Sequence, residues 1–179
     1  MSGPLIIPWK GVSPRIAADA FIAPNAVIIG DVEIGSKASI WFGCVLRADV
    51  NYIRVGARSN IQDGTVVHCE SEWPGKQGFA TIIGDDVLIG HMVMIHGATL
   101  ENEAFIGMSS TLLNGTVVEG NAMVAAGALV AGKRIPRGQL WAGSPAKFMR
   151  DLTPEELVGM KAGKDRYVTN GQIYREQLG

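Results

Sequence analysis

Residues 83–100 read IGDDVLIGHMVMIHGATL, and Ile83, Ile89 and Ile95 stand six residues apart within this stretch. The same spacing continues in both directions along the chain when three shifts of register are allowed. Small residues, mainly Gly, Ala, Asp and Asn, crowd the positions between the repeats. The eighteen repeat positions are all Ile, Leu or Val: Ile16, Ile22, Ile28, Ile34, Ile40, Leu46, Val55, Ile61, Val67, Ile83, Ile89, Ile95, Leu100, Ile106, Leu112, Val118, Val124 and Val130.

A sustained period of six predicts a parallel β-helix, in which each six-residue rung supplies one inward aliphatic side chain and one tight turn. Three rungs close one triangular coil, so the eighteen rungs predict about six coils, stacked roughly 4.8 Å apart. The alternative is a β-sandwich of short strands. That fold predicts alternation with a period of two and strand spacings that vary, so the repeat favours the β-helix.

The composition excludes several classes of protein. The chain has 179 residues with 16 Lys and Arg against 17 Asp and Glu, and no basic cluster marks a nucleic-acid surface. No apolar run approaches the roughly 18 residues of a membrane-spanning helix, and the uncharged stretch before Lys10 contains two prolines, which makes a poor signal peptide. Cys44 and Cys69 match no metal or redox spacing. We therefore expect a cytoplasmic protein that binds neither nucleic acid nor membrane.

The repeat ends near Ile135, and a helix is predicted further on. Thr153 fits the N-cap, a proline follows it, and Glu156 completes a capping box. We expect an apolar stripe on this helix to pack along the solenoid through Leu152, Leu157, Met160, Tyr167 and Val168. The predicted organisation is a β-helix domain over residues 1–151, with an inserted loop at residues 70–79, and a C-terminal helix over residues 152–179.

The three histidines are candidate metal ligands because of their places in the repeat. His68 follows Val67 and His96 follows Ile95, so both hold the same place in their rungs. Without the ten-residue insertion, 18 residues separate Val67 from Ile95, which is one full coil. The two imidazoles are therefore expected to stack on one face about 4.8 Å apart at the backbone, where they can share one metal ion.

His91 lies one rung before His96 and is expected to point from another corner of the triangle. It can complete the same site only from a neighbouring solenoid, with three chains arranged around a threefold axis. Such a homotrimer would hold one metal at each subunit interface, bound by three histidines with a fourth position open. That pattern is typical of catalytic rather than structural zinc.

The chain resembles the γ-class carbonic anhydrases, in particular their shorter bacterial branch. The likeness is carried by residues 47–49 (RAD), residues 60–68 (NIQDGTVVH), Gly90-His91 and residues 95–97 (IHG), and it extends over nearly the whole chain. The resemblance implies that the β-helix is left-handed. It also implies that His68 and His96 of one subunit and His91 of the next bind the metal.

The resemblance implies roles for six further residues. Gln62 matches the glutamine beside the metal-bound water, and Asn60 helps to anchor substrate or water. Arg47, Asp49 and Asp63 match charges near the subunit interface, where an Arg–carboxylate contact would hold the half-sites in register. Relatives that lack a shuttle carboxylate use a tyrosine of the terminal helix, and Tyr167 fits that place best; packing alone is the other interpretation of Tyr167.

The chain departs from the archetype at two places. Val50 stands where the archetype has a carboxylate, and the loop at residues 70–79 is shorter than the archetype's acidic loop. Glu70 does not align with the proton-shuttling glutamate of that loop. These departures affect proton release rather than the predicted metal ligands.

The predicted function is therefore reversible hydration of CO2 to bicarbonate by a metal-bound hydroxide at a trimer interface. Zinc is the expected metal, and three imidazoles also suit Fe2+ or Co2+. Two alternatives stay open: a hexapeptide acyltransferase or CoA-linked enzyme, because residues 143–147 (GSPAK) occur in that superfamily too, and a non-catalytic trimer clamped by its metal.

Overall fold

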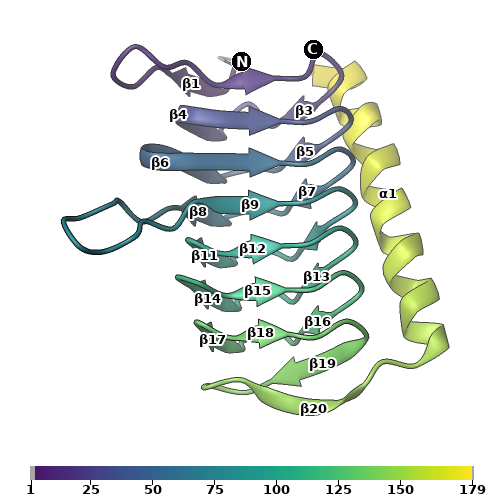
Figure 1. Cartoon of the computed structure of the whole chain (residues 1–179). Helices are drawn as coiled ribbons and strands as arrows, with labels where there is room; N and C mark the ends of the chain where they lie inside the picture. The colour runs from purple at the N-terminus through teal and green to yellow at the C-terminus, as the bar shows by residue number, and fades with distance from the viewer. Residues whose placement is uncertain (1–2, 179) are drawn as a thin grey trace.

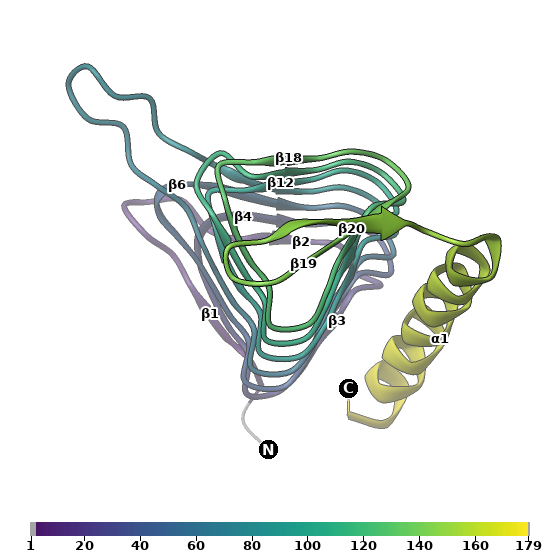
Figure 2. The same ribbon diagram turned by 90° about the horizontal axis from the view of Figure 1, so that it is seen from below.

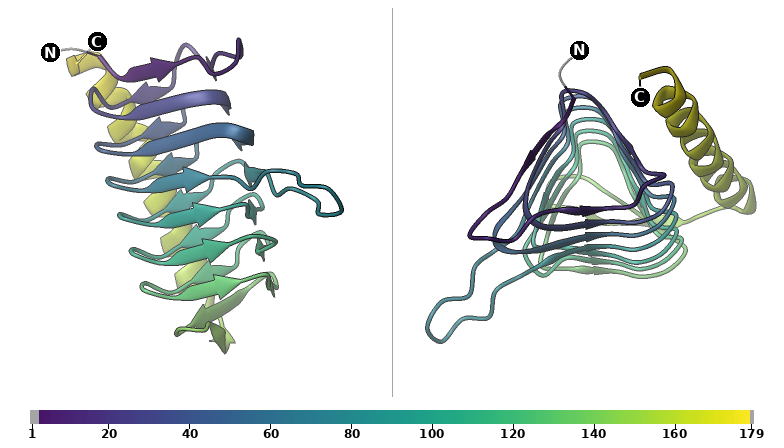
Figure 3. Two further views of the ribbon diagram at one scale, coloured as in Figure 1. Left: turned by 90° about the vertical axis from the view of Figure 1, so that its left-hand side faces the viewer. Right: turned by 90° about the horizontal axis from the view of Figure 1, so that it is seen from above.

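The chain folds into a triangular solenoid of parallel strands with a single helix beside it (Figures 1 and 2). The structure is a computed structural model, and it describes residues 3–178. In Figure 1 the front strands run from left to right, the chain returns behind them, and successive coils descend, so the solenoid is left-handed. The view from above in Figure 3 shows the three flat faces of the prism. The predicted left-handed β-helix with a C-terminal helix is confirmed.

Three faces, here called A, B and C, follow one another along the chain in every coil. Face A consists of β1 (Leu5–Ile7), the first halves of β4 (Val27–Ile34) and β6 (Val45–Val55), β8 (Val66–His68), β11 (Met94–His96), β14 (Thr111–Leu113) and β17 (Leu129–Ala131). Face B consists of β2 (Arg15–Ile16), the second halves of β4 and β6, β9 (Thr81–Ile83), β12 (Thr99–Leu100), β15 (Val117–Val118) and β18 (Arg134–Ile135). Face C consists of β3 (Phe21–Ile22), β5 (Ser39–Ile40), β7 (Asn60–Ile61), β10 (Leu88–Ile89), β13 (Phe105–Ile106), β16 (Met123–Val124) and β19 (Gln139–Ala142).

The core is the ladder of aliphatic side chains expected from the repeat. All eighteen repeat positions are buried except Ile16 and Ile22, which are partly exposed near the N-terminal end. Within residues 3–178 each face stacks seven strands rather than the predicted six. The additional rungs are β1, β18 and β19, and they escaped the prediction because their residues fall outside the aliphatic register.

The C-terminal end of the solenoid is closed by β20 (Lys147–Asp151), which pairs antiparallel with β19. Helix α1 (Pro154–Leu178) then runs back along face C and contacts β3, β5, β7 and β10 (Figure 2). The predicted capping box is present, because Thr153 N donates to Glu156 Oε2 at 2.9 Å and Glu156 N donates to Thr153 Oγ1 at 3.3 Å. Among the described residues, no helix has the length and apolar character needed to cross a bilayer.

The insertion at residues 70–79 forms an arm that projects from the corner between faces A and B (Figures 1 and 3). Its base is a bridge between Glu70 and Phe79, and its tip is a second bridge between Trp73 and Lys76. The arm leaves the solenoid two residues after His68. This position places its base beside the candidate metal ligands.

Candidate metal centre

His68 and His96 stand at the ends of β8 and β11 and are direct partners in the parallel register of face A. Their ring centroids are 5.0 Å apart, and His68 Nδ1 lies 3.1 Å from His96 Nε2. Both residues are partly buried. The stacking predicted from the sequence is therefore present, and the two imidazoles converge through one nitrogen each.

The outer nitrogen of each imidazole is held by an oxygen atom. His68 Nε2 lies 2.9 Å from Asp49 Oδ1, and His96 Nδ1 lies 2.7 Å from Asn114 Oδ1. Although burial opposes it, hydrogen bonds from His68 and Arg47 lower the pKa of Asp49, which keeps this carboxylate ionised at neutral pH. Carboxylate and amide oxygens only accept hydrogen bonds, so both outer nitrogens carry the proton. In the neutral rings the lone pairs of His68 Nδ1 and His96 Nε2 then face each other.

Two converging lone pairs repel each other unless a cation lies between them. Two nitrogens that each bind one zinc ion at about 2.0–2.1 Å in tetrahedral geometry stand roughly 3.3–3.4 Å apart. The observed 3.1 Å separation is close to that value. The donor set and its outer acceptors therefore fit a zinc-type ion, and they match the common arrangement in which a ligating histidine donates its other N–H to an oxygen.

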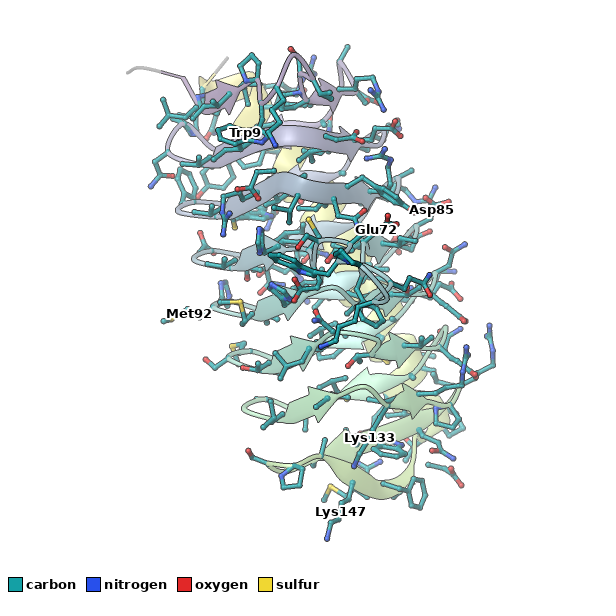
Figure 4. All side chains as sticks on the ribbon, turned by 60° about the vertical axis from the view of Figure 1, so that its left-hand side comes forward. Trp9, Glu72, Asp85, Met92, Lys133 and Lys147 are labelled. Carbon is teal, nitrogen blue, oxygen red and sulfur yellow. The ribbon has the colours of Figure 1, made fainter. Side chains whose placement is uncertain are left out.

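One chain alone does not complete the site. Within residues 3–178 no group of three His, Cys, Asp or Glu side chains is arranged to hold a metal. His91 lies in the turn after β10, at the corner between faces C and A, and its Nδ1 lies 2.8 Å from Asp63 Oδ2. The His91 side chain is 43% exposed, against 17% for His68. As the register predicts, His91 belongs to a different corner, and Figure 4 shows its neighbour Met92 projecting from that edge.

Beside His91 a groove of about 410 Å³ opens on face C, and we call it the His91 groove. Its lining is mainly apolar: Gln62, Leu88, Gly90, His91, Phe105, Ile106, Gly107, Met108, Met123, Val124, Ala125, Ala126, Leu140 and Tyr167. Gln62 and Tyr167 thus line the same groove as His91, whereas His68 and His96 lie at the opposite edge of face A, next to face B.

Gln62 is held firmly at the edge of this groove. Gln62 is only 4% exposed, and its Nε2 donates a hydrogen bond to Asn60 Oδ1 at 3.0 Å. Asn60 is fully buried, so its amide is available to orient Gln62 but not to contact solvent. Because the Gln62 amide nitrogen is engaged by Asn60, its Oε1 is the atom that can meet a ligand.

Tyr167 reaches the groove from α1 and packs edge-on against Trp41, with centroids 5.3 Å apart at 86°. Burial and the charge of Asp63 raise the pKa of the Tyr167 phenol. At neutral pH this hydroxyl is therefore protonated. It is suited to donating a hydrogen bond rather than to accepting a proton.

The interface charges predicted from the sequence form two separate contacts. Arg47 Nη1 lies 2.5 Å from Asp49 Oδ2 in the same chain, through one nitrogen–oxygen pair. Asp49 therefore links Arg47 to His68, whereas Asp63 supports His91 at the other corner.

Asn114, which bridges His96 and the arm, was not among the site residues predicted from the sequence. Its Oδ1 faces His96, and its Nδ2 donates to Glu70 Oε2 at 3.1 Å. The one available signal was its position 18 residues after His96, which is about one coil further along the solenoid.

The chain is similar to known proteins in both sequence and structure. A family model described as bacterial transferase hexapeptide (six repeats) matches residues 13–48. A carbonic anhydrase from Geobacillus kaustophilus is 42% identical over 172 residues, covering 96% of this chain and 91% of that protein.

Gamma carbonic anhydrase 2, mitochondrial, from Arabidopsis thaliana is 51% identical over 166 residues. The match covers 92% of this chain but only 60% of the plant protein. The crystal structure of a hexapeptide transferase family protein from Anaplasma phagocytophilum superimposes with a TM-score of 0.88 at 46% identity, covering 95% of this chain and 98% of that one.

Proposed function

The chain belongs to the γ-carbonic anhydrase family, and from this premise we propose that it catalyses the reversible hydration of CO2 to bicarbonate. The observation that carries the proposal is the 3.1 Å approach of His68 Nδ1 to His96 Nε2, with both outer nitrogens held by acceptors. Two facing lone pairs repel each other, so this arrangement of the two imidazoles is favourable when both nitrogens bind one cation.

In this proposal the protein is a homotrimer, and the third ligand is His91 of a neighbouring copy. His91 suits that role because Asp63 holds its Nδ1, which leaves Nε2 at an exposed corner. Three imidazoles and one open position suit zinc, and Fe2+ or Co2+ are the alternatives. With such an ion bound, the pKa of a water at the open position would fall to about 7, which would supply a nucleophile at neutral pH.

The residues of this chain then bind and orient the reactants. The apolar lining of the His91 groove favours CO2, which carries no charge, over charged competitors. Gln62 Oε1 accepts a hydrogen bond from the attacking water, and Asn60 keeps the Gln62 side chain in place. The hydroxyl of Tyr167 holds a further water on the path by which the proton leaves.

Two other functions are compatible with the fold. A hexapeptide acyltransferase needs one histidine as general base and no metal shared between subunits. A trimer that uses its metal only as a clamp would keep the ion and lack turnover.

Stopped-flow CO2 hydration with zinc-reconstituted protein separates these functions. We expect hydration that depends on zinc and is lost in His96→Ala. Binding of one zinc ion per chain without CO2 hydration would support the non-catalytic trimer clamped by its metal. Absence of zinc binding would favour an acyltransferase.

A further inference from the structure

The arm and the candidate metal ligand His96 are joined by a continuous pair of hydrogen bonds. His96 Nδ1 and Asn114 Oδ1 are 2.7 Å apart, and Asn114 Nδ2 and Glu70 Oε2 are 3.1 Å apart. Glu70 is the first residue of the arm, and Asn114 follows β14, one coil beyond His96. Three segments that are distant in sequence therefore meet through a single amide.

The chemistry of the three groups gives this connection one direction. An ionised carboxylate only accepts hydrogen bonds, so Glu70 must receive the Asn114 amide protons. The amide oxygen of Asn114 is then turned toward His96, and His96 Nδ1 must be the protonated nitrogen. The lone pair of the neutral ring is left on Nε2, which faces His68. An amide without Glu70 could turn over and present its NH2 group to His96 instead.

The base of the arm is fixed closely enough to hold Glu70 in this role. Glu70 N donates to Phe79 O at 2.8 Å, and Phe79 N donates to Glu70 O at 3.1 Å. Phe79 packs over Gly97 and Gly115, where a Cβ atom would meet the Phe79 Cβ at 2.6 Å and its ring at 3.3 Å, respectively.

A Cβ at Gly97 would also meet Asn114 Oδ1 at 2.5 Å, and Gly97 has φ of +60°. Gly97, the residue after His96, therefore leaves no room for a side chain, because both Asn114 and Phe79 of the arm lie against its backbone. Ser71 N donates to the other Glu70 oxygen, Oε1, at 3.1 Å, which fixes the orientation of the carboxylate.

We propose that Asn114 and Glu70 are positioning residues that hold His96 as the Nδ1–H tautomer, with Nε2 ready to bind the metal. This inference rests on the metal site of the proposed function and adds the part of the chain that prepares it. The arm then serves the metal centre through Glu70. Glu70 acts on the ligand rather than on the departing proton.

The first test is the tautomer of His96 in metal-free protein, read by 15N NMR after selective labelling of histidine. The chain has only three histidines, and His96 is assigned by its loss in His96→Gln. At mildly alkaline pH, where imidazole is neutral, wild-type His96 is expected in the Nδ1–H form. Asn114→Ala and Glu70→Gln should both relax it to a mixture of the two tautomers.

The second test is zinc affinity, measured by chelator competition with zinc alone. Asn114→Ala should weaken zinc binding about 10- to 100-fold, as expected for an outer partner of a ligating histidine, and Glu70→Gln should weaken it less. Glu72→Gln is the matched control, because Glu72 lies on the same arm (labelled in Figure 4) and makes no hydrogen bond with Asn114 in the described part of the chain. The control should leave tautomer and affinity unchanged.

Retention of the Nδ1–H tautomer in a folded Asn114→Ala or Glu70→Gln variant overturns the proposal, as does a tautomer change with wild-type zinc affinity. If one of these two variants fails to fold, the tautomer of His96 in the other variant tests the proposal. Zinc binding that depends on Asn114 without CO2 hydration contradicts the proposed function and supports this inference. If the wild-type protein hydrates CO2 but the tautomer of His96 is the same in Asn114→Ala, the proposed function is supported and this inference is contradicted.

Discussion

His68 and His96 are direct register partners on adjacent strands, and their facing nitrogens lie 3.1 Å apart. The relationship follows from coil geometry, because equivalent positions of successive coils stack at one strand spacing. His91 is excluded from this pair by the same geometry, since it lies at the corner between faces C and A. A three-histidine site thus requires a second chain.

The first prediction is that two inactive variants restore each other. His68→Ala and His91→Ala should each lose tight zinc binding when assembled alone. Co-refolded, they should recover part of it, because some interfaces of a mixed trimer pair an intact His68 and His96 with an intact His91. Zinc per chain, measured by elemental analysis after gel filtration, checks this.

His68→Ala mixed with His96→Ala is the control for this experiment. Those two residues occupy the same half-site, so no interface with His91 regains both of them. Recovery in the control, or none in the His68 and His91 mixture, would mean that the ligands are not divided between chains as proposed.

A second prediction concerns Gln62, whose Nε2 donates to Asn60 Oδ1 and whose Oε1 accepts no hydrogen bond within residues 3–178. Gln62→Ala removes one hydrogen bond that orients the attacking water. We expect kcat/KM for CO2 hydration to fall about 10- to 100-fold, by analogy with other residues that support a metal site, while the zinc content stays at the wild-type level. Stopped-flow assays at matched zinc loading measure this.

Asn60→Ala should reproduce part of the Gln62→Ala loss, since Asn60 acts through Gln62. Gln77→Ala on the exposed arm is the matched control and should retain the wild-type rate. An unchanged kcat/KM in Gln62→Ala would reduce Gln62 to a packing residue of the groove.

The fold and the stacking of His68 on His96 were predictable because a six-residue period leaves the chain little conformational freedom. Each rung places its aliphatic inside and its following residue at the same place on the outer surface. The spacing of the rungs therefore places Val67 opposite Ile95 and His68 opposite His96, as the register confirms. The rungs of β1 and β18 were missed because they lie off the six-residue register, and the rung of β19 was missed because the partly buried Trp141 stands opposite Val124.

The surroundings of these histidines were less predictable because they depend on how irregular segments fold back on the solenoid. The Asn114–Glu70 contact joins residues 44 positions apart through a loop that has no repeat. The approach of Tyr167 to the groove depends on the docking of α1 on face C. Neither relationship leaves a periodic trace in the sequence.

A third prediction is a pH dependence of stability at the start of α1. The hydrogen bonds from Arg150, at 2.7 and 2.8 Å, and the backbone N–H of Thr153 lower the pKa of Glu156 to about 2. A carboxyl whose pKa falls on folding stabilises the fold above its ordinary value of 4.5, and this contribution is lost as the pH falls toward about 2.

Glu156→Gln retains the side-chain acceptor of the capping box and removes the charge. Its stability deficit in urea unfolding should therefore be constant near neutral pH and should shrink as the pH falls from 4.5 toward about 2. Thr153→Ala is the comparison, with a loss of about 1 kcal/mol from the missing N-cap. A deficit of Glu156→Gln that grows on acidification would contradict the assignment.

The last prediction concerns Tyr167, which lines the His91 groove together with Gln62. Because burial and Asp63 raise the pKa of its phenol, the hydroxyl is a donor at neutral pH. It can orient water on the path of the departing proton but does not take up that proton. Tyr167→Phe keeps the ring packing on Trp41 and removes only this donor. We expect kcat to fall more than kcat/KM, since proton release to buffer follows the conversion of CO2.

A small buffer such as imidazole should restore part of the lost kcat in Tyr167→Phe, because it carries the proton away without the ordered water. Tyr174→Phe is the matched control, since Tyr174 lies on the same helix and also packs on Trp41 but does not line the groove. It should behave as the wild type at every buffer concentration. Equal kcat and kcat/KM for wild type and Tyr167→Phe at low buffer would make Tyr167 a packing residue, and the arm carboxylate of Glu72 would be the next group to test for proton transfer.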